Sequence, residues 1–386
     1  MHKIKIVNGF NSASIRLRIL LRIVILAFST FPNPNKSLRL IKAIINKRKK
    51  IHNLPPIDRF VYAMGKYFWS EDIPGWPSSN LDKFLKAELL RSQQNKNKSY
   101  LLHTVIFAIT SRCKLRCSHC FEWDRISKDE YISLNDLLKI LDKLQSSGLT
   151  HIQFSGGEPL VRLNDLLVLI EKAHKTMDCW ILTSGFGLTY QKAELLSRVG
   201  LTGANISLDH WDEKIHNQFR NNNKSFYWVN QAVYNCRKAG ILVSLSICAT
   251  NSFISNKNLK AYMELAREWG VGFIRILEPR DTGRFKHQDV QLKPEKIELL
   301  RAFFQETYRS SEYRDYPIVS YPGYHQRKVG CFGAGNRYLY IDSKGQIHAC
   351  PFCQNDVGNA LYDSLETSID KLQQKGCDVF KLSKFM

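Results

Sequence analysis

The sequence lacks a long uninterrupted run of apolar residues, and its first 57 residues contain no acidic side chain. Its most apolar stretch near the N-terminus, residues 15–28, is interrupted by Arg16, Arg18 and Arg22. A membrane-spanning helix needs about 20 consecutive apolar residues, so this stretch does not predict one. The pattern of a cleavable secretory signal is also missing, and we therefore expect a cytoplasmic protein.

Positive charge is concentrated at the N-terminus. The formal net charge is +21, and residues 1–60 carry thirteen lysines and arginines against one acid, Asp58. A basic amphipathic helix is typical of contact with an anionic membrane surface, which predicts a peripheral position at the inner membrane face. An ordinary helix packed on the main domain is an alternative of equal weight. Nucleic acid ranks last, because no recognised nucleic-acid module accompanies the basic residues.

The length and the cysteines limit the class of protein. With 386 residues and 44% hydrophobic content, the chain can bury a full core in two or three structural units. Seven of its ten cysteines fall in two groups, at residues 113–120 and 331–377. In a reducing compartment such groups favour metal sites over disulfides. The other three, Cys179, Cys236 and Cys248, are expected to be buried thiols.

The stretch TSRCKLRCSHCFEW, residues 110–123, carries Cys113, Cys117 and Cys120. Three thiols within eight residues cannot all be buried as small hydrophobic side chains, so they are predicted metal ligands. Three thiolates at this spacing can hold three irons of a four-iron, four-sulfur cube and leave the fourth open. Zinc is the alternative, but it requires a fourth ligand, and His119 directly precedes Cys120 and cannot easily reach the same ion.

A second motif, HIQFSGGEPL at residues 151–160, ends a short apolar run with Gly156, Gly157, Glu158 and Pro159. Two glycines let a backbone approach a ligand closely, while the carboxylate and the proline define the rim. Together the two motifs resemble the radical S-adenosylmethionine (radical SAM) superfamily, whose signature is C-x3-C-x2-C after the first strand and GGEP after the second. The sequence departs from the family pattern at His119, because many members have an aromatic residue just before the third cysteine.

Short β-branched runs alternate with amphipathic segments from residue 103 onward. This alternation predicts an α/β fold with a parallel sheet, and six strands are expected, at residues 103–109, 151–154, 180–183, 204–208, 242–249 and 272–277. With the resemblance, the prediction becomes a partial (βα)6 barrel of the TIM type, whose ligands bind at the carboxyl edge of the strands. We expect four parts: a basic helical extension (1–100), the barrel (101–285), a helical connector (286–317) and a C-terminal domain (318–386).

The resemblance also assigns residues to SAM. Ser184 follows the third strand, and Ser207 and Asp209 end the fourth. In similar enzymes these positions contact SAM, and Arg220 is placed to pair with its carboxylate. A surface salt bridge is the alternative for Arg220.

The second cysteine group frames a predicted hairpin, with strands at residues 337–341 and 346–348. Its members, Cys331, Cys350, Cys353 and Cys377, resemble the ligands of the auxiliary-cluster domains called SPASM and Twitch. Four cysteines imply one auxiliary [4Fe-4S] cluster, with zinc as a minority alternative. Whether three or all four ligate is left open.

The resemblance implies reductive cleavage of SAM to a 5′-deoxyadenosyl radical, which removes a hydrogen atom from the substrate. We expect a peptide or protein to be modified, by crosslink, epimerisation or oxidation, with the auxiliary cluster assisting electron transfer. A small molecule, sugar or lipid precursor at the membrane is the alternative, and a non-catalytic iron-sulfur or zinc protein is the alternative from another class. The implied partner is a reductant such as flavodoxin or ferredoxin. No side chain is assigned as catalytic.

Overall fold

A parallel sheet forms the centre of the computed structural model, which describes residues 4–93, 102–127 and 129–380. Six strands pair side by side in chain order. They are β4 (Thr104–Ala108), β5 (His151–Ser155), β6 (Asp178–Thr183), β7 (Leu201–Ser207), β8 (Leu242–Cys248) and β9 (Phe273–Leu277). This confirms the predicted α/β fold. The expected domain boundary between residues 100 and 101 lies outside the described residues.

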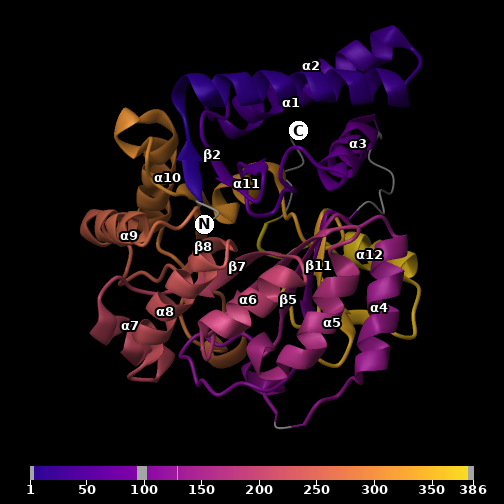
Figure 1. Ribbon diagram of the computed structural model, residues 1–386. Coiled ribbons are helices and arrows are strands. Elements are labelled where there is room, and N and C mark those ends of the chain that lie inside the picture. The colour runs from indigo at the N-terminus through magenta and orange to yellow at the C-terminus, as the bar shows by residue number, and fades with distance from the viewer. Residues whose placement is uncertain (1–3, 94–101, 128, 381–386) are drawn as a thin grey trace.

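Helices follow each strand from β4 to β8 and cover the outer face of the sheet (Figure 1). They are α4 (Leu134–Ser146), α5 (Leu163–Ala173), α6 (Tyr190–Arg198), α7 (Glu213–Arg220), α8 (Ser225–Lys238) and α9 (Asn256–Glu268). Helix α4 illustrates why these segments are helical. The Ser133 side chain accepts a hydrogen bond from the Asp136 amide and so caps the helix. The buried residues of α4 recur at helical spacing, and they are Leu137, Ile140, Leu141 and Leu144. Such a helix must pack its apolar stripe against the sheet.

The sheet continues beyond the six strands at both edges. Strand β10 (Ile318–Ser320) pairs in parallel with β9, and β11 (Tyr338–Ile341) pairs in parallel with β4. Strand β12 (Gln346–His348) then pairs antiparallel with β11, and β13 (Asp356–Asn359) pairs antiparallel with β12. The predicted C-terminal hairpin is therefore an extension of the barrel sheet, a pairing that sequence periodicity cannot reveal. Three helices accompany this part: α10 (Pro294–Arg309), α11 (Pro322–Val329) and α12 (Leu365–Lys375).

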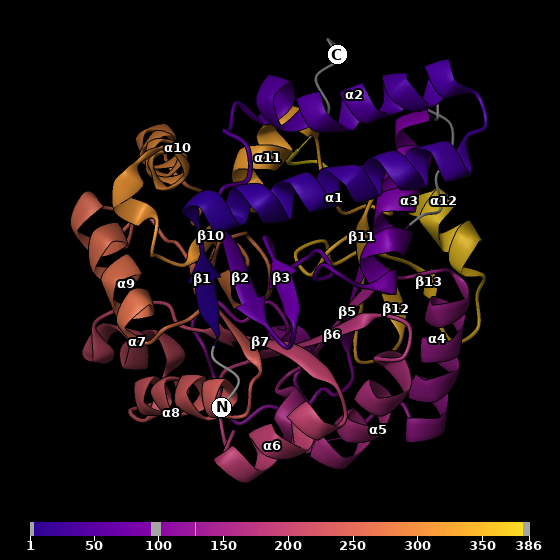
Figure 2. The same cartoon turned by 45° about the horizontal axis from the view of Figure 1, so that its top comes forward.

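The N-terminal part contains strands as well as the expected helices. Its elements are β1 (Lys5–Val7), α1 (Gly9–Thr30), α2 (Pro34–His52), β2 (Phe60–Ala63), β3 (Lys66–Phe68) and α3 (Ser79–Gln93). The strands form an antiparallel sheet in the order β1-β2-β3, and α1 runs across it (Figure 2). Apolar side chains of α1, α2, β2 and α3 share one core cluster. None of the helices in the described ranges is long and apolar enough to cross a bilayer.

This N-terminal part covers the amino ends of the barrel strands. Val61 and Phe68 pack in one apolar cluster with Trp180, Leu242 and Phe273, which lie near the starts of β6, β8 and β9. A polar contact adds to it, because the side chain of Asp178, the first residue of β6, accepts hydrogen bonds from the Gly75 amide and the Asn80 side chain. The opposite edge, at the carboxyl ends of the strands, is left for the site.

Candidate functional site

The loop that follows β4 brings Cys113, Cys117 and Cys120 to the carboxyl edge of the sheet. Cys117 is buried and the other two are half-buried, and all three are free thiols. Burial raises the pKa of Cys113 and that of Cys120 to about 12. Metal binding would have to displace these thiol protons, as it does at every thiolate site.

The glycine pair packs directly against this cysteine loop. A Cβ at Gly156, where φ is +143°, would lie 2.3 Å from the carbonyl oxygen of Thr110, and a Cβ at Gly157 would lie 2.4 Å from that of Arg112. The amides of Gly157 and Glu158 donate to the same two carbonyls, at 2.9 and 2.8 Å. The two glycines are therefore required by the close approach of the cysteine loop, in addition to any approach of a ligand.

Glu158 connects this loop to the end of β6. Its carboxylate accepts hydrogen bonds from the Thr183 hydroxyl at 2.7 Å, the Ser184 amide at 2.9 Å and the Ser184 hydroxyl at 2.5 Å. Burial raises the pKa of Glu158, while these hydrogen bonds oppose that rise. Pro159 is buried and opens the turn that leads into α5. Two predicted site residues, Glu158 and Ser184, are thus in direct contact, and Thr183 was missed.

A buried ion pair lies beside Cys117. Arg220, the last residue of α7, donates from Nε to Asp209 at 2.5 Å, and its Nη1 lies 3.6 Å from the Cys117 sulfur. Burial alone would raise the pKa of Asp209, but the Arg220 guanidinium, the neighbouring histidines and the Cys248 amide together lower it. The side chain of Arg220 is only 9% exposed, so the surface salt bridge considered above is wrong.

Histidines complete this part of the site. The backbone amide of Asp209 donates to Nδ1 of His216, and burial together with the Arg220 charge lowers the pKa of His216 to about 3. His119 stacks on Phe219 with ring centroids 4.7 Å apart, and burial lowers its pKa to about 4. Both imidazoles are therefore neutral near pH 7. His216 was missed in the sequence, where only its H-x-x-x-R spacing to Arg220 points to it.

Other strand-end residues lie apart from this cluster. Ser207 is half-buried at the end of β7. The Thr250 hydroxyl bonds to Ser252, and the Asn251 side chain bonds to the backbone of residues 291 and 293. Thr250 is therefore held within its own loop, whereas Asn251 joins this loop to the segment before α10.

The second cysteine group also comes together. The sulfurs of Cys350 and Cys353 lie 3.3 Å apart, and the thiol of Cys377 hydrogen-bonds with those of Cys331 and Cys353. The backbone of Phe380 forms hydrogen bonds with two of these cysteines. Its carbonyl oxygen accepts from the Cys331 amide, and its amide donates to the Cys377 sulfur.

Glu278, just beyond β9, links this group to the barrel. Its carboxylate binds the Arg327 guanidinium at 2.5 and 2.8 Å and accepts from the Tyr321 hydroxyl at 2.6 Å. The guanidinium carbons of Arg327 and Arg280 lie 5.6 and 4.8 Å from the centre of the Phe380 ring. A continuous set of contacts therefore runs from the barrel edge to Cys377.

The donor sets fit iron-sulfur clusters better than single ions. Within the described residues, no three cysteine, histidine or acidic side chains are arranged around one metal ion. A closed zinc site requires four ligands on one ion, whereas in a cluster each thiolate binds a different iron. Three thiols on one loop, packed against a glycine pair, have the chemistry that a cluster needs.

Comparison with known proteins gives the same family. A family model of the radical SAM superfamily matches residues 107–267. The antilisterial bacteriocin subtilosin biosynthesis protein AlbA of Bacillus subtilis is 26% identical over 271 residues, covering 68% of this chain and 58% of AlbA. The GTP 3′,8-cyclase of Chlorobaculum tepidum is 30% identical over 191 residues, covering 47% and 57%. The chain thus spans less than two thirds of the length of these relatives.

The fold has a counterpart among solved structures. Streptococcus suis SuiB bound to its precursor peptide SuiA superposes with a TM-score of 0.58 at 13% identity, covering 88% of this chain and 77% of SuiB. At this identity the likeness concerns the fold alone. It agrees with the largely parallel sheet described above. The chain is thus similar to the radical SAM superfamily over residues 107–267.

Proposed function

We propose that this chain is a radical SAM enzyme that reductively cleaves SAM and removes a hydrogen atom from a peptide or protein substrate. The observation that carries the proposal is the packing of the Cys113, Cys117 and Cys120 loop against Gly156 and Gly157, inside the matched domain. A [4Fe-4S] cluster and SAM, when bound, supply one electron and a 5′-deoxyadenosyl radical at this edge. The resulting change would be a crosslink, an epimerisation or an oxidation.

The chain's own residues would bind and orient these groups. Cys113, Cys117 and Cys120 would hold the cluster. Arg220 puts a permanent positive charge beside Cys117, where it favours thiolate and carboxylate groups. Asp209 orients Arg220 from the other side.

Glu158 positions Ser184, and both would lie at the rim of the SAM site. Gly156, Gly157 and Pro159 flank Glu158 in the same turn, and Ser207 ends β7 nearby in the sheet. The neutral imidazoles of His119 and His216 add no charge to this region. Arg220 therefore supplies the positive charge next to the Cys117 sulfur.

A second [4Fe-4S] cluster would be held by Cys331, Cys350, Cys353 and Cys377. The contacts from Glu278 through Arg327 to Phe380 would keep Cys377 within reach of the other three. Four thiolates would make this cluster an electron carrier, while three would leave an iron open to substrate. Flavodoxin or ferredoxin is the class of reductant that such chemistry requires.

The similar proteins support two different substrate classes. AlbA takes part in the biosynthesis of subtilosin, a bacteriocin, and SuiB is bound to a precursor peptide, which favours a peptide. The relationship to GTP 3′,8-cyclases favours a small molecule as the second candidate, including a sugar or lipid precursor.

The test is formation of 5′-deoxyadenosine by anaerobically reconstituted, reduced protein, with and without soluble-peptide and membrane-lipid fractions. Stimulation by the peptide fraction supports the first substrate class, and stimulation by the lipid fraction supports the second. Cys117→Ala should abolish the product, because the first cluster loses a ligand, and normal cleavage by this variant contradicts the assignment. A fully loaded first cluster without any product would leave the non-catalytic iron-sulfur or zinc protein as the better description.

A further inference from the structure

Helix α1 has two apolar stripes, and only one of them is covered. Its buried residues, Ile15, Ile19, Ile23, Leu26 and Ala27, pack in the core cluster of the N-terminal part. A second set is exposed to solvent: Phe10 (89%), Leu17 (59%), Leu21 (55%), Ile25 (56%) and Phe28 (40%). At 1.5 Å per residue, this second stripe extends about 27 Å along the helix. A helix that is apolar on both sides normally has protein or lipid on both.

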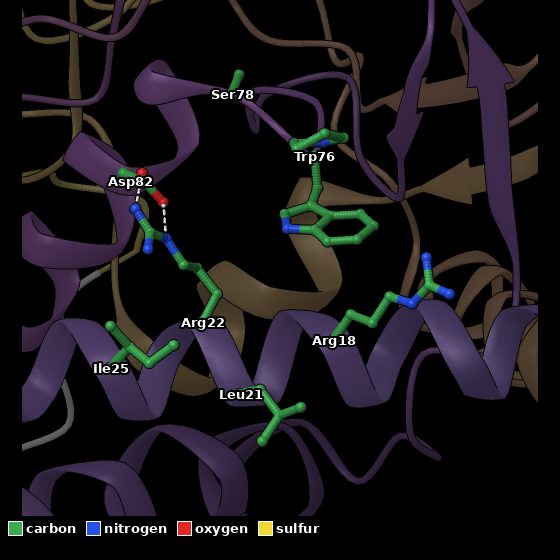
Figure 3. Close-up of a pocket in the computed structure, with 8 residues that line it drawn as sticks. Arg18, Leu21, Arg22, Ile25, Trp76, Ser78 and Asp82 are labelled. Carbon is green, nitrogen blue, oxygen red and sulfur yellow. Dashed lines mark hydrogen bonds and ion pairs between the residues drawn. The ribbon is translucent and has the colours of Figure 1, made fainter.

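The surroundings of this stripe are positively charged. A cavity of about 550 Å³ lies beside it, between α1 and the loop before α3 (Figure 3). Leu21 and Ile25 line it with Trp76 and Pro77, and Arg18 extends toward Trp76. Its one acid, Asp82, is already bound by Arg22 at 2.6 and 2.9 Å. In the part of the chain that the structure describes, Arg18 has no carboxylate partner.

We propose that the exposed stripe of α1, with Arg18 beside it, rests on an anionic lipid bilayer, with the helix parallel to the membrane plane. An interfacial helix buries its apolar face at the boundary of headgroups and acyl chains, and flanking arginines attract anionic headgroups. The first 57 residues add no acidic side chain that would repel such a surface. A protein partner would be recognised through placed polar groups at a rim, whereas this stripe presents mainly apolar and cationic side chains.

The proposed contact also sets the orientation of the site. Because the N-terminal part covers the amino ends of the barrel strands, α1 lies on the opposite side of the barrel from the cysteine loop. The carboxyl edge of the sheet would therefore face away from the bilayer. This arrangement favours a substrate that approaches from solution over a lipid still embedded in the same membrane.

The test is co-sedimentation of the full-length protein with vesicles of phosphatidylcholine, with and without phosphatidylglycerol, at low and at high salt. We expect binding only to the anionic vesicles and weakening in high salt. The double variant Leu21→Gln/Ile25→Gln should bind at least about tenfold more weakly. The matched control, Leu195→Gln/Ile215→Gln, changes exposed apolar residues of α6 and α7, which lie outside the stripe, and should bind normally.

Charge is tested separately. Arg18→Glu should weaken binding to the anionic vesicles by about tenfold, while Lys260→Glu on α9 should not. All variants change exposed residues, and an unchanged circular dichroism spectrum verifies their fold. Absence of vesicle binding by the unaltered protein, or equal loss in the control variants, would overturn the proposal, as would binding of an acidic amphipathic peptide in place of vesicles. No SAM is present in this assay, so its outcome is independent of the proposed catalysis.

Discussion

Glu158 is the residue at which the two sequence motifs and the third barrel strand meet. Its backbone amide donates a hydrogen bond to the Arg112 carbonyl in the cysteine loop. Its carboxylate accepts three hydrogen bonds from Thr183 and Ser184. Each of these groups donates to it, so an acceptor at this position satisfies all of them. Charge and geometry together therefore explain why an acid follows the glycine pair.

Glu158→Gln should weaken SAM binding by about tenfold without loss of iron. The amide nitrogen of the variant would face a backbone or hydroxyl donor, and a lost hydrogen bond to a charged group costs about 1.5 kcal/mol or more. SAM affinity of the reconstituted protein is measured by equilibrium dialysis, with iron content as the readout for the intact cysteine ligands. Glu171→Gln, on the exposed face of α5, serves as the control. Equal affinity in both variants would show that Glu158 does not shape the SAM site.

His103 provides a test of pH dependence. It is buried, and its Nε2 lies 2.8 Å from the Glu88 carboxylate. Burial lowers the pKa of His103 to about 4, although Glu88 opposes the shift. Since the folded pKa is below the unfolded value of about 6.5, the stability from neutral His103 is complete above that value and is lost as pH falls toward 4.

Between pH 7 and pH 5 the protein should lose about 2 kcal/mol more stability than His103→Gln, which cannot titrate there. Urea midpoints of the cluster-free protein, measured at both pH values, test this expectation. Parallel pH profiles for the two proteins would mean that His103 titrates normally in the fold.

At the scale of elements, Arg275 of β9 joins the barrel interior to the N-terminal part. Its Nε lies 2.6 Å from Glu71, its Nη2 binds Asp72, and Glu71 also accepts from Asn205 of β7. Burial would lower the pKa of Arg275, but the two carboxylates hold it above its usual value. The loop after β3 therefore acts as a plug whose acids are neutralised inside the barrel.

Arg275→Met should destabilise the protein by about 3 kcal/mol, because it leaves the buried Glu71 carboxylate and the half-buried Asp72 carboxylate without their cation. Arg198→Met, which removes an exposed pair with Glu194 on α6, should cost less than about 1 kcal/mol. Urea unfolding compares the two, and adding Glu71→Gln to Arg275→Met should restore part of the loss. A similar midpoint for both single variants would argue against the plug.

At the scale of the whole molecule, the N-terminal part is integral to the fold. Strand β1 pairs with β2, and α1 covers a core that includes Phe60, Leu81 and Leu89, each with 0% exposure. The aromatic residues of this part mostly pack: Phe68 is buried, and Trp69 lies against the same cluster as α1. A bilayer contact must therefore use the outer side of α1, since its inner side is occupied.

Deletion of residues 1–50 should lower the melting temperature and increase binding of a hydrophobic dye. The deletion removes one strand and uncovers apolar core surface, at a cost of roughly 25 cal/mol for each Å² exposed. Thermal unfolding of the truncated and full-length chains, followed by circular dichroism, provides the comparison. An unchanged melting temperature would show that this part is an independent appendage.

The sequence by itself determined the features that depend on neighbours along the chain. The spacing of Cys113, Cys117 and Cys120, the GGEP turn and the alternation of strands and helices predicted the barrel and the location of its site. The α/β fold is confirmed because its signals are local, and parallel strands bring their carboxyl ends to one edge, where the site is predicted. The assignments of the cluster and SAM residues stay predictions that the experiments above can test.

Only the tertiary structure decided which distant segments meet. The pairing of β11 with β4, the insertion of Glu71 and Asp72 beside Arg275, and the position of Arg220 beside Cys117 all join residues far apart in sequence. Tertiary structure also decided which side of α1 is buried. Its two apolar stripes look alike in the sequence, although only one of them is covered. These outcomes depend on burial, on strand pairing or on the charge of a partner, and none of these is carried by a residue's immediate neighbours.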